Sequence, residues 1–403
     1  MEKEKLRQIL SANNFSPSQR IIDDLYKVIN YLDLNYKRVS KDKIVDGEFL
    51  KVFSHQKDLS LGEIYLNRII NNVKKIIIDK NTNVKGAYEH SSKAITFNPD
   101  RINNQARHWN ISNIFNPEIR ELLKDEGALK QFKKNLADKI IIHEFNHAAG
   151  DDKSIDLVYS QHNGGFFSHS KASTYCSRLE ELMAEKLALD ATGQKICYFE
   201  TYKNQSICGY NPESSNFAIS SLIEFIPKAL GEKDFVENYF INPTAYLEKL
   251  NQKFKNAFPG QNSKSFSTYL NDSLIDIADN NNAEKLIELQ TFFLKIYKER
   301  LKLNFKQGLG FDIKLFKQST EDYMMFVNLL AYQFDAKTGK VILGKNCDEL
   351  KEIYKLQLEL YKKYKPYLSN NLKDYRDFKS QVKSKYINAI KKSLSINEEA
   401  ERS

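Results

Sequence analysis

Two histidines and a glutamate stand in one short segment, His143-Glu144-Phe145-Asn146-His147, which has the form His-Glu-x-x-His. Residues four apart on an α-helix lie about 40° apart around its axis, so both imidazoles can reach one metal ion. Glu144 lies about 100° from His143, where a carboxylate reaches a water on that ion without being a ligand itself. Zinc lowers the pKa of such a water to about 7, and the carboxylate takes its proton during attack on a carbonyl. The motif therefore predicts a Zn²⁺ site with His143 and His147 as ligands and Glu144 as general base.

The alternative for the same residues is structural, with two histidines inside the core and a glutamate on the surface. Histidines on an apolar helix face need hydrogen-bond partners when no metal is present, because an unsatisfied buried polar group is costly. The chain has 7 histidines in 403 residues, so two of them at this spacing beside a glutamate favour the metal site.

A catalytic zinc ion needs a third protein ligand and one open position, and the sequence offers three sources for that ligand. The first is the extended pattern His-Glu-x-x-His-x-x-Gly-x-x-His. Gly150 stands at the required place, but Lys153 occupies the position of the last histidine. A protonated lysine cannot bind zinc, which excludes this source.

The second source is Glu181. On a helix, Glu181, Ala184, Glu185 and Ala188 share one face. The two alanines would let this helix approach the helix of the histidine motif closely. Glu181 would then complete the metal shell, and Glu185 would accept a hydrogen bond from a ligating imidazole and fix its tautomer.

These residues resemble the gluzincin branch of zinc metallopeptidases, in which the histidine motif is followed on the next helix by Glu-x-x-[Ala/Ser]-[Asp/Glu]. Here Glu181-x-x-Ala184-Glu185 fits, with glutamate where the family commonly has aspartate. The resemblance covers roughly residues 84–192. It implies a zincin-like core and an edge strand before the metal helix that aligns an extended substrate, a role for which 94–98 is the candidate.

The third source is His162, whose surroundings are similar to those of SprT-like metallopeptidases, where a third histidine precedes a glycine and a phenylalanine. Fourteen residues separate it from His147, and residues 164–166 are Gly-Gly-Phe. Asn163 stands where that family prefers glycine. This resemblance implies DNA-associated substrates. Glu181 is the favoured third ligand, and His162 is the alternative.

Hydrophobic periodicity predicts the elements that carry these residues. One long helix is expected over 128–149 with Gly150 just after its end, and a second over 177–192 ending at Gly193. A polar loop is expected between them. The stripe of the first helix that we expect to face the core consists of Leu129, Phe132, Leu136, Ile140, His143 and His147.

Short runs of β-forming residues before the long helix predict a small sheet. They cover 75–79, 84–88 and 94–98, with turn-forming residues between the first two. We expect the three strands to pair in antiparallel fashion and to follow a helix at 61–73.

The rest of the chain has mainly helical patterns, interrupted at 258–263. We therefore predict an α+β, mostly helical fold with a zincin-like core. Its expected parts are a helical N-terminal region (1–73), a zincin-like catalytic domain (74–257) and a helical C-terminal domain (264–403).

Composition narrows the class of protein. The chain has 61 basic and 52 acidic side chains, a net charge of +9, and 41% hydrophobic residues, which is ordinary for a globular protein. Four cysteines without a Cys-x-x-Cys pair argue against a disulfide framework and a thiolate zinc site. Neither a Sec-type signal peptide nor an apolar run long enough to cross a bilayer is visible. We expect a soluble protein, either cytoplasmic or secreted without a Sec signal, as an effector.

The positive charge is spread along the chain and is only a weak argument for nucleic acid as a partner. The segment 361–365, Tyr-Lys-Lys-Tyr-Lys, has the composition of single-strand binders, but an amphipathic helix with lysine stems over buried tyrosines is the favoured interpretation. We therefore expect a zinc metallopeptidase acting on proteins or peptides. The competing hypothesis is a non-catalytic helical binding protein in which the metal is structural or absent.

Overall fold

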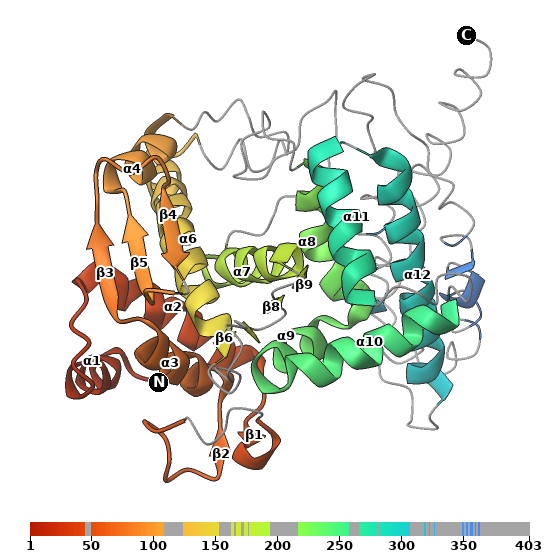
Figure 1. The fold of residues 1–403 in the computed structure, drawn as a ribbon, viewed down its shortest axis with the longest axis horizontal. Helices are drawn as coiled ribbons and strands as arrows, with labels where there is room; N and C mark the ends of the chain where they lie inside the picture. Colours follow the sequence, from red (N-terminus) through yellow and green to blue (C-terminus); the bar gives the residue numbers. More distant parts are fainter. Residues whose placement is uncertain are drawn as a thin grey trace. The chain divides into compact units, whose positions relative to one another are not determined.

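The computed structural model describes most of the first 306 residues and scattered positions after them. These are residues 1–44, 50–89, 91–108, 124–152, 163–164, 167–170, 173–175, 177–193, 217–257, 266–280 and 282–306, with single positions between 318 and 362. The described chain is mostly helical with small sheets, as predicted for an α+β protein (Figure 1).

The chain forms two compact units. The first comprises residues 1–197, 207–211 and 233–275, and the second comprises 198–206, 212–232 and 276–403. The predicted division into 1–73, 74–257 and 264–403 remains a prediction, because contacts between segments do not decide which of them fold alone. The expected break at 258–263 lies outside the described residues.

Three helices begin the first unit: α1 (Lys3–Ala12), α2 (Gln19–Asn35) and α3 (Leu61–Asn72). Strands β1 (Val39–Ser40) and β2 (Asp58–Leu59) pair between α2 and α3, with the short 3₁₀ helix η1 (Lys41–Lys43) after β1. The expected helix at 61–73 is thus confirmed to within one residue. A capping box fixes its start, because the Ser60 hydroxyl accepts from Glu63 N and the Glu63 carboxylate accepts from Ser60 N.

The predicted three-stranded sheet is present, but its arrangement differs from the expectation. Its strands are β3 (Lys75–Ile78), β4 (Gly86–Glu89) and β5 (Ala94–Phe97), in the order β3-β5-β4. β5 is parallel to β3 and antiparallel to β4, so the sheet is mixed rather than antiparallel. The most buried strand, β5, lies between the other two, and three of its four residues are buried.

This order also corrects the expectation for segment 94–98. Because β5 has strand neighbours on both sides, it cannot be an edge strand. In this three-stranded sheet, β4 is the edge strand that packs on the helix of the histidine motif.

Helix α4 (Pro99–His108) follows the sheet, and α6 (Glu126–Gly150) carries the histidine motif. α6 packs against α2, α3, α4, α7 and strand β4 (Figure 1). We had expected Gly150 to follow the end of α6, but it is the last residue of the helix. No left-handed turn is needed there, because side chains from α3 bind the terminal carbonyls of α6.

Four short strands connect α6 to α7 where a polar loop was expected. They are β6 (Asp151–Asp152), β7 (Asn163–Gly164), β8 (Phe167–Ser170) and β9 (Ser173–Tyr175), in one antiparallel sheet. Helix α7 (Ser177–Ala191) follows and ends one residue before the predicted end at 192. Gly193, which was expected to terminate it, has a positive φ of 64°.

The remaining described elements are helices, as expected. They are α8 (Phe217–Leu230), α9 (Glu232–Ile241), α10 (Pro243–Ala257), α11 (Phe266–Asn280) and α12 (Ala283–Lys306). α8 and α12 pack together in the second unit, where Phe326 meets Phe225 and Tyr297 at ring-centroid distances of 4.9 and 4.8 Å.

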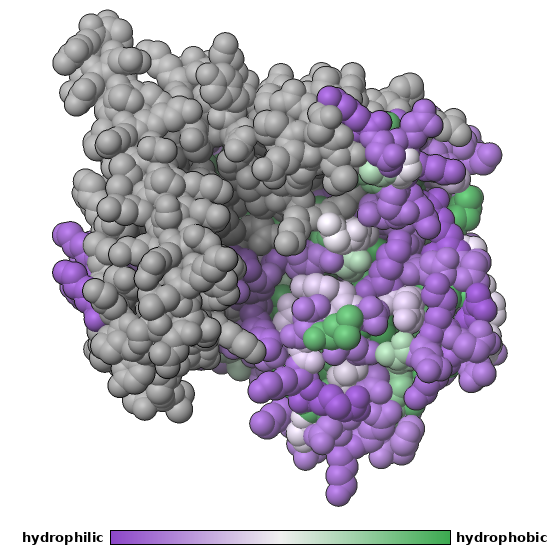
Figure 2. Space-filling view, turned by 180° about the vertical axis from the view of Figure 1, so that it is seen from behind, coloured by the Kyte–Doolittle hydropathy of each residue, from purple (hydrophilic) through white to green (hydrophobic). Residues whose placement is uncertain are grey.

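The described surface is largely polar. Seen from behind, hydrophilic residues dominate, and hydrophobic ones form small, separated spots (Figure 2). The large hydrophobic side chains that are exposed include Leu34, Ile78, Val84 and Leu303. Among the helices described, none combines the length and the apolar character needed to cross a bilayer.

Candidate active site

The histidine motif lies on a helix that is buried on nearly all sides. Between residues 136 and 150, every side chain of α6 is buried except Ile140, His143 and His147, which are partly exposed. These three residues are three and four apart and therefore form one line along the helix. The expectation that the histidines face the core was wrong, because residues 136–150 of α6 are covered on every side except the one that carries the imidazoles.

The two imidazoles converge through their Nε2 atoms. The Nε2 atoms of His143 and His147 are 3.1 Å apart, and the ring planes meet at 85°. Two nitrogens bound to one tetrahedral zinc ion at about 2.05 Å lie about 3.3 Å apart, so this pair is spaced for a shared ion. In the metal-free chain the same distance accommodates an N–H···N hydrogen bond.

Glu185 of α7 contacts the opposite nitrogen of the first imidazole, as predicted. Its Oε2 atom lies 3.1 Å from Nδ1 of His143, and its Oε1 atom accepts from Nζ of Lys139. An ionised carboxylate only accepts hydrogen bonds, so Nδ1 is the donor and Nε2 keeps a lone pair for a metal.

The charge of Glu185 is secured by its neighbours. Burial alone would raise the pKa of this carboxyl, but the Lys139 ammonium and the His143 imidazole outweigh burial and lower the pKa to about 2. Glu185 therefore stays ionised over the whole range in which an imidazole can bind a metal.

Glu144 points from α6 toward the sheet. It is 8% exposed, and a Cβ atom at Gly86 of β4 would lie 2.7 Å from its Cγ and 3.0 Å from its Oε1. Only a glycine leaves room for the carboxylate at this point of the strand. The side chain predicted to be the general base is thus held between α6 and the edge strand β4.

Small residues bring α7 close to α6, as predicted. Ala184 and Ala188 are fully buried, and the Asn146 amide of α6 donates to the Ala184 carbonyl over 2.8 Å. Glu181 lies in α7 one turn before Glu185, although its side chain is outside the described part of the chain. Within that part, no three histidine, cysteine, aspartate or glutamate side chains form a metal-binding group.

Two other predicted features lie outside the described residues. His162, the alternative third ligand, belongs to the segment 153–162, and the Lys- and Tyr-rich segment 361–365 is described only at Lys362.

Helix α3 holds the C-terminal end of α6. The Asn72 amide donates to the Ala148 carbonyl over 2.9 Å, and the Arg68 guanidinium donates to the Ala149 carbonyl over 3.3 Å. The last carbonyls of a helix have no partner within it, so these two side chains complete the end that follows His147. The sequence analysis did not identify Arg68 or Asn72 as partners of α6. The available signal was that these two polar residues lie one turn apart on α3 and therefore share a face.

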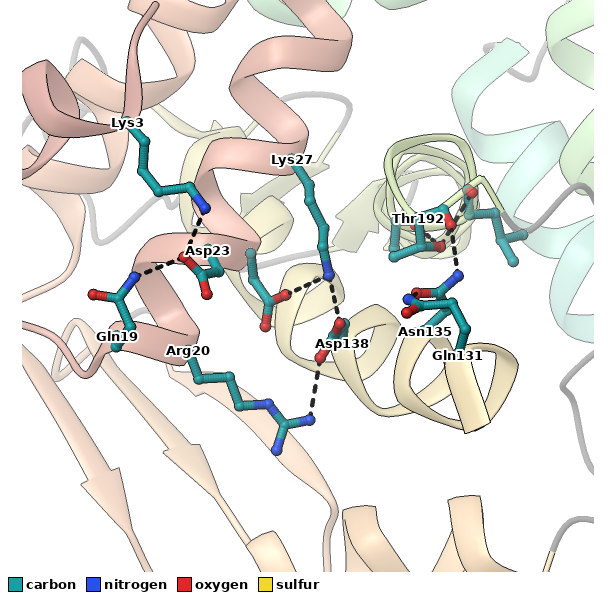
Figure 3. A network of polar contacts seen from close by, with 12 residues as sticks. Lys3, Gln19, Arg20, Asp23, Lys27, Gln131, Asn135, Asp138 and Thr192 are labelled. Carbon is teal, nitrogen blue, oxygen red and sulfur yellow. Dashed lines mark hydrogen bonds and ion pairs between the residues drawn. The ribbon is translucent and has the colours of Figure 1, made fainter. Parts of the chain in front are cut away.

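Helix α2 holds the middle of α6 through ion pairs to a buried aspartate (Figure 3). Asp138 is fully buried and accepts from Lys27 and Arg20 of α2. Lys27 also donates to Asp24, which is 1% exposed. Burial and the nearby Asp138 raise the pKa of Asp24 to about 7.

Comparisons of this chain with protein-family models, with curated proteins and with solved structures give no match. The assignment of a function therefore depends on the geometry of the site.

Proposed function

We propose that the protein is a zinc-dependent metallopeptidase with a zincin-like core. The observation that carries the proposal is the convergence of the two Nε2 atoms on the open side of a buried helix, with Glu185 engaging Nδ1 of one imidazole. In this proposal His143, His147 and Glu181 hold the metal, and Glu144 is the general base.

A zinc ion bound there would supply Lewis-acid activation of a water molecule and of the substrate carbonyl. The residues of the chain supply the rest. Glu144 accepts a proton from the attacking water and passes it to the leaving amine. Glu185 keeps the proton of His143 on Nδ1, so that Nε2 stays available as a ligand.

The edge strand β4 supports a peptide substrate. Asn98 N donates to Lys85 O over 2.9 Å, so the backbone groups of residue 85 face β5. Because successive residues of a strand direct their N–H and C=O groups to opposite sides, those of residues 86 and 88 point away from β5. An extended peptide that pairs with this edge would pass Gly86 and therefore Glu144. In this proposal the scissile bond of the peptide lies beside Glu144.

The first test is zinc content. We expect about one zinc per chain in the wild type and none after His143→Ala or His147→Ala. Loss after Glu181→Ala but not after His162→Ala would support Glu181 as third ligand, and the reverse result would support His162. No zinc in the wild type after reconstitution would overturn the proposal and favour a helical binding protein.

The second test is catalytic. Glu144→Gln is expected to keep the zinc but to lower hydrolysis of a peptide library about 10²- to 10⁴-fold, because the proton acceptor is lost. Glu126→Gln, in the first turn of the same helix, is the matched control and should cleave like the wild type. Wild-type cleavage by Glu144→Gln would contradict the mechanism.

A further inference from the structure

Lys139 is a buried lysine that the mechanism above does not use. It belongs to α6, one turn before His143, and its side chain is 8% exposed. An ammonium group buried without a partner is strongly destabilising, and apolar residues can often replace a buried ion pair without loss of stability. A lysine at this place therefore suggests a role other than stability.

The role follows from what its ammonium group contacts. Lys139 donates to Oε1 of Glu185, and the other oxygen of that carboxylate, Oε2, lies 3.1 Å from Nδ1 of His143. The three groups form a chain from an ammonium through a carboxylate to an imidazole, all between α6 and α7.

We infer that Lys139 is a positioning residue of the metal site: it anchors one oxygen of Glu185 and thereby holds the other on Nδ1 of His143. This inference rests on the proposed function. Lys139 is not one of the proposed metal ligands, and in this inference it acts through Glu185.

The length of the Glu185 side chain explains why an anchor is needed. A glutamate has one more rotatable bond than an aspartate, so a single hydrogen bond to the imidazole leaves its carboxylate able to turn. Two contacts, one for each oxygen, fix the plane of the carboxylate. The imidazole is then held in one tautomer, and its Nε2 is directed at His147, 3.1 Å away.

A second buried lysine provides a matched control. Lys186 of α7 is 1% exposed and donates to Asp190 over 2.9 Å, and Asp190 also accepts from Tyr31 of α2. Lys186→Met removes a buried lysine from the same helix pair but leaves the contact between Glu185 and His143 in place.

The first experiment needs no metal. Ring ¹⁵N shifts of metal-free protein, assigned to His143 with His143→Gln, report which nitrogen carries the proton. The wild type and Lys186→Met should show the proton on Nδ1, whereas Lys139→Met should show a mixture of both tautomers. An unchanged tautomer in Lys139→Met would overturn the inference. Lys139→Gln carries the same test if the methionine variant unfolds.

The second experiment measures zinc affinity by competition with a chelator. Loss of a residue that orients a ligand typically weakens metal binding about 10- to 100-fold, so Lys139→Met should raise the zinc Kd about tenfold. The same change in a Glu185→Gln background should have no further effect, because the residue through which Lys139 acts is altered already. A zinc Kd within twofold of wild type in Lys139→Met would contradict the inference.

The two experiments separate the inference from the proposed function. If the wild type takes up no zinc, the proposed function fails, while the tautomer comparison still decides whether Lys139 orients His143. If zinc binds and Glu144→Gln abolishes cleavage but Lys139→Met changes neither tautomer nor Kd, the inference alone fails.

Discussion

At the scale of single residues, the site depends on a hydrogen atom in place of a side chain. Gly86 faces Glu144 so closely that a methyl group would lie 2.7 Å from Cγ of the glutamate. This contact is made by the middle of the Glu144 side chain, so the carboxylate has to move when the space is filled.

We therefore predict that the Gly86→Ala variant still binds zinc but loses most of the proposed peptidase activity. A displacement of about 1 Å at a reacting group can cost about 100-fold in rate, and we expect a loss of that order in peptide hydrolysis. Gly127→Ala is the control. Gly127 lies in the first turn of α6, the helix that carries Glu144, and a Cβ atom there would meet only Asp125 Oδ1, at 3.1 Å. Equal activity in the two variants would show that Glu144 does not need the space at Gly86.

At the scale of elements, the junction of α2 and α6 makes stability depend on pH. The pKa of Asp24 is about 7 in the folded protein, against an ordinary value of 3.8. Between these values the folded protein binds a proton that the unfolded chain has released. The free energy of unfolding should therefore fall as pH rises from about 4 to 7, by about 4 kcal/mol in total.

Asp24→Asn should abolish this fall, because an asparagine oxygen still accepts from Lys27 but does not titrate. The measurement is urea unfolding at several pH values between 4.5 and 7.5. Asp23→Asn is the matched control: burial would raise the pKa of Asp23, but hydrogen bonds from Lys3 and Gln19 outweigh burial and lower it, so this variant should keep the fall. A parallel pH profile in Asp24→Asn and the wild type would assign the effect to another group.

The same elements show what could be predicted from the sequence. Local patterns were sufficient for the helices α3, α6 and α7 and for the contact of Glu185 with His143, because these depend on spacing along one or two helices. The close approach of α7 also followed from Ala184 and Ala188, since small side chains permit it wherever they face a neighbour.

Features that depend on distant segments could not be predicted. In the order β3-β5-β4 the most buried strand is central. The three strand sequences have patterns too similar to show which of them would be buried most. The open side of α6 was misassigned because a helix segment that is covered on all sides but one has no single apolar stripe. The role of Gly86 appears only once β4 lies against Glu144.

At the scale of the whole molecule, the chain forms two compact units, and the proposed metal site belongs to the first. A ligand that binds only the folded state stabilises the part of the structure that contacts it. Zinc should therefore slow amide hydrogen exchange in α6 and α7 and leave α8 and α12 unchanged. Exchange measured by mass spectrometry with and without chelator tests this, and equal protection in all four helices would argue against a site confined to the first unit.

The way in which α6 is completed has a consequence for maturation. Its terminal carbonyls are bound by Asn72 and Arg68, and its buried Asp138 is neutralised by Lys27 and Arg20. All four partners precede residue 74, in the predicted helical N-terminal region (1–73). Removal of a propeptide activates an enzyme, but cleavage near residue 74 would not have this effect here. Loss of this region would leave the helix of the histidine motif with an unsatisfied end and a buried, unpaired charge, so proteolysis at this place is expected to destroy the proposed metal site.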